Sequence, residues 1–238
     1  MASVRMLGEL SNKGAFQMSN SLRRLAPLTG IPFAVLLAYT FFGTPNSPDA
    51  KDTGVQVIAH YQAHHSSHIA GDVCGGIAVV FFLFFISSLR SYFKAHEGGD
   101  GLSMAAFAGG IMIGVGGAIF TSLDFTLASD RNHLTPAAAN AINVLSNDFF
   151  WPFSIGLIVF SFAIGLAIIN TGALPKWLGW VMVVVAIVGF SPIGFFSFFV
   201  IMIWSVIVAI LIYRRTGPAA AGTGGATPGL GAEPGLGT

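Results

Sequence analysis

Long apolar segments separated by short polar ones dominate this chain and leave little choice of fold. Of its 238 residues, 54% are hydrophobic and only 9% are Asp, Glu, Lys or Arg, against about 25% charged residues in a typical soluble domain. A helix needs about 20 mostly apolar residues to cross the hydrocarbon of a bilayer. The sequence therefore predicts an all-α integral membrane bundle of six transmembrane helices, at Leu25–Phe42, Ile69–Leu89, Leu102–Ala128, Phe149–Ile169, Leu174–Ser191 and Ile193–Tyr213.

The last two segments follow one another almost without a break. Together they are about twice as long as one span, and Ser191-Pro192-Ile193-Gly194 between them is a typical reversal signal. We therefore expect a helical hairpin here, and not one long helix.

The basic residues test this count independently. With six spans and a cytoplasmic N-terminus, nine of the eleven Lys and Arg fall on the cytoplasmic side, at Arg5, Lys13, Arg23, Arg24, Arg90, Lys94, Lys176, Arg214 and Arg215. Only Lys51 and Arg131 fall outside, as the positive-inside rule expects. This distribution predicts that both termini are cytoplasmic.

Three regions of different composition follow along the chain. Residues 1–22 form a polar cytoplasmic lead-in, residues 23–215 form the six-helix transmembrane domain, and residues 216–238 are rich in Gly, Ala and Pro. Such a composition predicts a disordered tail.

Five ionisable side chains lie within thirteen residues at the start of the second span. They are His60, His64, His65, His68 and Asp72. At about 100° per residue, a helix places Tyr61 and all of these except His60 on one stripe, with His60 at its edge. Because charge and imidazole are costly near hydrocarbon, an intramembrane cluster of this kind suggests a functional site.

Two more carboxylates are predicted at a similar depth on the same, extracytoplasmic side. Asp124 lies about one turn inside the end of the third span, and Asp148 lies near the start of the fourth. The polar residues His133, Asn143 and Asn147 lie within reach of this end. The other side has only the loop residues His96, Glu97 and Asp100, so the sequence predicts one His/Asp pocket.

Three kinds of chemistry suit this pocket, and ordinary polar packing is a fourth interpretation. A divalent transition metal, with Zn or Cu the most plausible, would take His64, His68 and Asp72 as ligands, and Asp124 as fourth ligand or as orienting group. A second shell around these ligands would comprise His60, His65, His133, Asp148 and Asn147. The same groups suit a proton relay in a proton-coupled transporter or permease, or a pH sensor.

A transporter needs polar groups on both sides of a pathway, and the cytoplasmic half of the spans supplies almost none. A non-enzymatic membrane subunit or scaffold is the third class, in which the lipid bilayer and a membrane-protein partner or a second copy are the contacts. No basic patch indicates nucleic acid, and whether the chain is an enzyme stays open. Glycine pairs four residues apart, Gly71/Gly75 and Gly110/Gly114, predict close packing of the second and third spans.

A nine-residue segment and a pair of arginines resemble a known bacterial pattern. The segment is Gly172-Ala173-Leu174-Pro175-Lys176-Trp177-Leu178-Gly179-Trp180, and the pair is Arg214-Arg215. Over about residues 20–215 the chain resembles six-span integral membrane proteins of actinobacterial type, a family of unknown function. The resemblance implies a multi-pass protein of a bacterial cytoplasmic membrane and transfers no catalytic residue.

Overall fold

The computed structural model describes residues 25–189, residue 191 and residues 194–216. The predicted lead-in 1–22 and all but the first residue of the predicted tail 216–238 lie outside this part. Within it every regular element is a helix: η1 (Ala26–Thr29), α3 (Gly30–Phe42), α4 (Gly54–Lys94), α5 (Asp100–Ser129), α6 (Pro136–Asp148), α7 (Phe150–Thr171), α8 (Lys176–Val188), η2 (Gly194–Phe196) and α9 (Ser197–Arg215). The all-α prediction is confirmed for the described residues.

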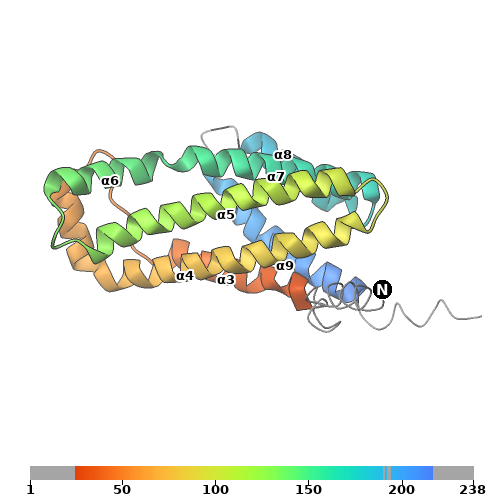
Figure 1. Cartoon of the computed structure of the whole chain (residues 1–238), viewed down its shortest axis with the longest axis horizontal. Helices are drawn as coiled ribbons and strands as arrows, with labels where there is room; N and C mark the ends of the chain where they lie inside the picture. The colour runs from red at the N-terminus through yellow and green to blue at the C-terminus, as the bar shows by residue number, and fades with distance from the viewer. Residues whose placement is uncertain (1–24, 190, 192–193, 217–238) are drawn as a thin grey trace, which may run out of the picture.

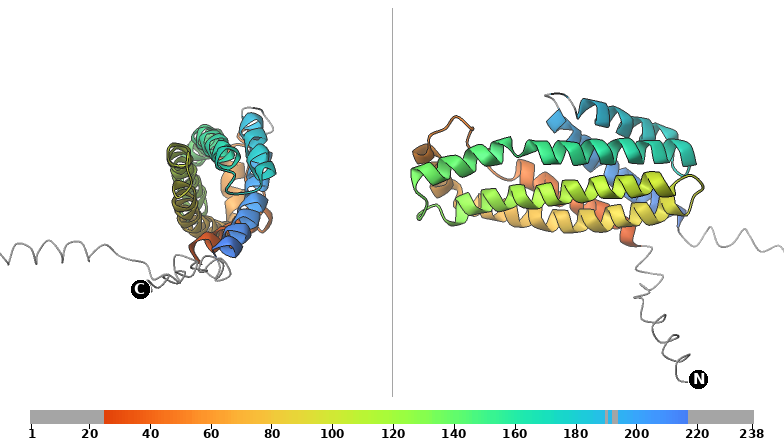
Figure 2. Two further views of the ribbon diagram at one scale, coloured as in Figure 1. Left: turned by 90° about the vertical axis from the view of Figure 1, so that its right-hand side faces the viewer. Right: turned by 45° about the horizontal axis from the view of Figure 1, so that its top comes forward.

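The helices form an elongated bundle (Figure 1). Helices α4, α5 and the α6–α7 pair run along its length, whereas α3, α8 and α9 do not reach the end where α6 lies. Seen along the long axis, α5 and α9 lie on opposite sides of the bundle (Figure 2). Among the described residues, the α6 end is therefore built by α4, α5, α6, the loop of residues 43–53 and the turn of residues 130–135.

Among the residues that the structure describes, four helical stretches are long and apolar enough to cross a membrane. They are α4, α5, the combined stretch Pro136–Thr171, and α9. The first and fifth predicted spans correspond to the shorter apolar helices Ala26–Phe42 and Lys176–Val188. The chain is thus built as a multi-pass membrane protein, while the count of six spans and the orientation of the termini stay predictions.

Helix α4 is too long to lie wholly in a bilayer. Its 41 residues extend about 60 Å at 1.5 Å per residue, against about 30 Å of hydrocarbon. Relative to the predicted second span, Ile69–Leu89, most of the excess falls on residues 54–68, at the α6 end, where this part of α4 and residues 124–129 of α5 pack with α6. We call these three segments the cap.

The cap has a small apolar core separate from that of the bundle. Its buried members are Val57, Tyr61, Leu127, Ala128 and Ala139. The larger core of the bundle includes no residue of α4 before Ala78 and no residue of α5 after Ile113. Between these limits α4 and α5 place buried polar side chains, so a polar layer divides the two cores.

Glycines let the long helices approach one another. A Cβ atom added to Gly110 would lie 2.7 Å from Ile86 Cδ1, and one added to Gly75 would lie 2.9 Å from Thr121 Cγ2. The predicted close packing of the second and third spans is therefore present as the α4–α5 contact. An equally close contact between α5 and α7, at Gly109 and Gly156, was not predicted.

Candidate functional site

The polar layer begins with an irregular turn in α4. The helix starts at a capping box, in which Thr53 N donates to Gln56 Oε1 (2.8 Å) and Gln56 N donates to the Thr53 hydroxyl (3.5 Å). At His64 the backbone leaves helical geometry, with φ −119° and ψ 19°. Residues eight apart on a straight helix are separated by about 12 Å along its axis, yet His60 Nε2 lies 3.1 Å from His68 Nε2. We attribute this contact to the irregular turn between the two histidines.

His68 lies at the centre of the layer and is 2% exposed. Its Nδ1 is 3.0 Å from Asp124 Oδ2, and its Nε2 faces His60. Asp124, also buried, accepts hydrogen bonds from the Tyr61 hydroxyl and, at 3.4 Å, from the Ser47 hydroxyl. Tyr61, Asp124, His68 and His60 thus form one continuous hydrogen-bonded series, which we call the polar chain.

The partners of each atom limit where the protons of the polar chain can lie. When Asp124 is ionised, its carboxylate accepts from His68, which then holds a proton on Nδ1, and a neutral His68 presents its Nε2 as an acceptor. His60 must therefore donate from its own Nε2. If both rings became imidazolium ions, two N–H groups would face each other at this contact, so the pair as built holds at most one extra proton.

A second carboxylate is buried beside the polar chain. Asp72, one turn after His68 on α4, is 8% exposed, and its carboxyl interacts with that of Asp124. Its Oδ2 has no hydrogen-bond partner among the described residues. Two carboxyls and an imidazole therefore share one poorly hydrated layer, where proton occupancy and charge are tightly linked.

The ends of the polar chain reach water. His60 is partly exposed, and the exposed His64 packs against it with tilted rings whose centroids are 4.7 Å apart. On the Asp124 side, Ser47, which donates to Asp124, is an exposed residue of the loop 43–53, which arches from α3 to α4 (Figure 2). Protons can therefore enter from the cap side without crossing the apolar core.

Helix α6 holds the loop in place. Asn143, which is 1% exposed, donates from its amide to Asp49 O at 2.8 Å. Asn147 donates to Pro48 O at 3.3 Å. These two bonds fix the segment that carries Ser47 and so couple α6 to the polar chain.

The structure brings together only part of the predicted metal set. His68 and Asp124 meet, and Asp72 lies next to them, but His64 is exposed and its Nδ1 pairs with His60 O of its own helix (3.1 Å). The predicted His64–His68 pair does not form, because the irregular turn offers His60 to His68 instead. Among the residues that the structure describes, no three His, Cys, Asp or Glu side chains form a group able to hold a metal ion.

The predicted second shell is mostly dispersed. Within it only His60 contacts His68. His133 is exposed in the α5–α6 turn, Asp148 is exposed at the end of α6, and His65 is partly exposed; Asn147 binds the loop. Sequence reasoning gave no role to Tyr61 or Ser47, although Tyr61 lies on the same helical stripe as His68, seven residues earlier.

The chain was compared with known protein families, with characterised proteins and with solved structures. No family model matches it, and neither a characterised protein nor a solved structure does. The fold and the site alone therefore define its class: a multi-pass helical membrane protein with a buried ionisable layer at one end of the bundle.

Proposed function

We propose that this protein is a proton-responsive membrane protein, in which proton binding to the polar chain controls the cap and the loop 43–53. The observation that supports it is the position of His68, buried between the Asp124 carboxylate and His60. Histidine is the side chain whose ordinary pKa, about 6.5, lies in the physiological range. Buried histidines and carboxylates in membrane proteins typically bind or relay protons.

The proposed response to protons follows from the hydrogen bond between His60 and His68. The pair can take up one extra proton and keep this contact, but a second extra proton makes both rings donors and breaks it. The charged or titratable groups near His60 include Asp52, His64, His68 and Asp124, and the ring of Tyr61. Asp52 places a carboxylate on the loop side of the pair. Separation of the rings would be transmitted to the loop through Asp124 and Ser47.

Proton conduction through the whole membrane, as in a proton-coupled permease, has less support. In the described cytoplasmic-half residues of the bundle, the buried polar side chains include Ser103, Ser161 and Ser205, and no buried carboxylate or histidine continues the polar chain. A polar chain that exchanges protons with only one side of the membrane suits a protein that protons regulate better than one that conducts protons.

Hydrogen–deuterium exchange of the purified protein in nanodiscs tests the proposal. Between pH 8 and pH 5, after correction for intrinsic rates, we expect exchange in residues 43–53 to rise at least tenfold. His68→Gln should abolish this pH dependence. His96→Gln replaces a histidine just beyond the opposite end of α4; it is the matched control and should leave the pH dependence unchanged. A loop whose exchange is the same at both pH values would refute the proposal.

Metal binding is the second candidate, and one observation favours it. Two imidazole Nε2 atoms face each other, and His68 is held through its Nδ1 by a carboxylate, as metal-binding histidines commonly are. Zn or Cu would replace the shared proton, with Asp72 or His64 as further ligands. Elemental analysis after zinc or copper supplementation decides: stoichiometric metal lost in His60→Ala and His68→Ala would support it, and metal-free protein would exclude it.

For topology we propose six spans in a bacterial cytoplasmic membrane, with both termini cytoplasmic and the cap outside. The distribution of Lys and Arg supports this orientation. In intact cells a membrane-impermeant maleimide should label Lys51→Cys but not Lys94→Cys. The reverse pattern would invert the topology.

A further inference from the structure

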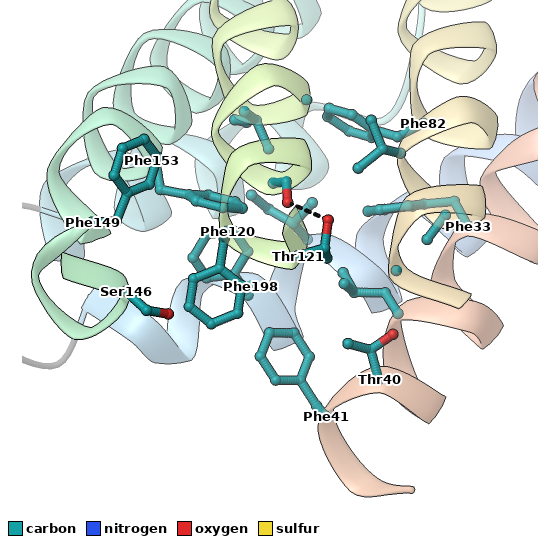
Figure 3. Close-up of a pocket in the computed structure, with 18 of the residues that line it drawn as sticks. Phe33, Thr40, Phe41, Phe82, Phe120, Thr121, Ser146, Phe149, Phe153 and Phe198 are labelled. Carbon is teal, nitrogen blue, oxygen red and sulfur yellow. Dashed lines mark hydrogen bonds between the residues drawn. The ribbon is translucent and has the colours of Figure 1, made fainter. Parts of the chain in front are cut away.

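A cavity of about 350 Å³ lies inside the bundle, next to the polar layer (Figure 3). Gly75 and Thr121, which line it, are three residues from Asp72 and Asp124, or about one helical turn. Its other walls come from α3, α7, α9 and the junction of α6 with α7. The polar chain itself does not line the cavity, so the two features are separate.

The walls are unusually rich in aromatic rings. Seven of the lining residues are phenylalanines, and several are already paired with one another. Phe33 and Phe82 have ring centroids 4.8 Å apart, and Phe153 and Phe198 have theirs 5.0 Å apart. Aromatic walls of this kind favour a flat ring, which can make offset or edge contacts with them.

The polar groups of the cavity are few and uncharged. They are Thr40, Thr121, Ser146 and Asn147, and no Asp, Glu, Lys, Arg or His among the described residues lines it. Thr40 donates its hydroxyl to Gly71 O (3.1 Å) and Thr121 to Gly117 O (3.0 Å), so both present oxygen lone pairs. Ser146 directs its hydroxyl towards the cavity (Figure 3). An ion would find no partner here, whereas one hydroxyl donor would.

We propose that this cavity is a binding site for an uncharged lipophilic phenol, that is, a molecule with one aromatic ring, a short apolar substituent and a single hydroxyl. The volume lies within the range of small-molecule sites, about 300–1,000 Å³. The phenylalanines would contact the ring, and the hydroxyl would donate to an acceptor among Thr40, Thr121 and Ser146. The proposal does not depend on proton binding at the polar chain.

Saturable binding of 4-butylphenol to the full-length protein in nanodiscs tests this site, with empty nanodiscs of the same lipid subtracted. We expect one bound molecule per chain and an affinity at least tenfold above that for butylbenzene, which lacks the hydroxyl. Thr121→Val, nearly the same in shape, and Ser146→Ala should together remove most of this preference while leaving butylbenzene binding unchanged.

A cavity-filling variant locates the bound molecule. Ala78 lines the cavity, and Ala78→Leu should lower 4-butylphenol affinity at least tenfold. Gly76→Leu is the matched control, because a Cβ at Gly76 meets no atom within 4 Å; it should bind like the wild type. If Ala78→Leu does not fold, Thr121→Val and Ser146→Ala still test the site. Binding that is unsaturable, equal for the two probes, or outcompeted by dodecane would overturn the proposal.

Discussion

Replacing Asp124 by leucine tests how much the buried layer contributes to stability. An ionised Asp124 is the acceptor for two buried donors, the Tyr61 hydroxyl and His68 Nδ1. Leucine is similar in size but leaves both donors unpaired. A buried donor without a partner costs about 1–3 kcal/mol, while interhelical hydrogen bonds in membrane proteins contribute only about 0.6 kcal/mol on average. We therefore expect Asp124→Leu to lower the free energy of unfolding by about 2–3 kcal/mol.

The substitution Asp124→Asn separates the two bonds. The amide oxygen of the new side chain can still accept from Tyr61, but its NH₂ group faces His68 Nδ1, so this variant should cost only about 1 kcal/mol. In a double-mutant cycle, Tyr61→Phe and Asp124→Leu should show a coupling of at least about 0.5 kcal/mol, because they remove the same bond.

The measurement is reversible unfolding in mixed micelles by SDS titration, followed by far-UV circular dichroism. Asp130→Leu is the control, since Asp130 lies at the exposed end of the same helix, and it should change stability by less than about 0.5 kcal/mol. If Asp124→Leu were as stable as the wild type, or if Asp130→Leu cost as much, the layer would not be held together by these bonds.

Three further predictions concern the cap and its histidines. Nitrogen-15 imidazole spectra at pH 8 should show His68 as the Nδ1–H tautomer, and this signal should be lost in Asp124→Leu; an Nε2–H tautomer in the wild type would contradict the proton assignment. Gly54→Ala should prevent the cap from forming, because its Cβ would lie 1.8 Å from Pro136 O, and hydrogen–deuterium exchange in α6 should therefore rise. Unchanged exchange in α6 would contradict this prediction. Gly76→Ala is the control. Thr135→Ala removes the N-cap hydroxyl of α6, which accepts from Ala138 N (3.2 Å), and should lower the free energy of unfolding by about 1 kcal/mol in the same SDS titration. An unchanged free energy of unfolding would show that α6 does not depend on its N-cap residue.

Hydrophobic patterning was enough to predict the helical architecture and the meeting of His68 with Asp124. Both residues are polar groups at corresponding depths on neighbouring apolar helices, and burial forces such groups together. The spacing of four residues also favoured His64 as the partner of His68, whereas the structure places His60 against His68. The partner is His60, because α4 is not helical at His64, where no glycine or proline marks an irregular turn in the sequence.

The position of the loop 43–53 could not be predicted from hydrophobic periodicity either. Its position depends on Asn143 and Asn147 of a helix almost one hundred residues later, and no local pattern indicates which carbonyl an amide will bind. Likewise, α8 is shorter than the predicted fifth span, since helix length in a packed bundle is decided by neighbouring helices as well as by hydropathy.

The polar layer at residues 62–77 of α4, which separates the two apolar cores, has a consequence for how the protein unfolds. Val57 and Leu127 belong to one buried cluster and Phe82 to another, so melting the smaller cluster removes little from the larger one. The cap should consequently open as a unit of its own, well before the helices of the larger core lose order. A molecule with such an independently opening end can change shape on one side of a bilayer while its spans stay fixed.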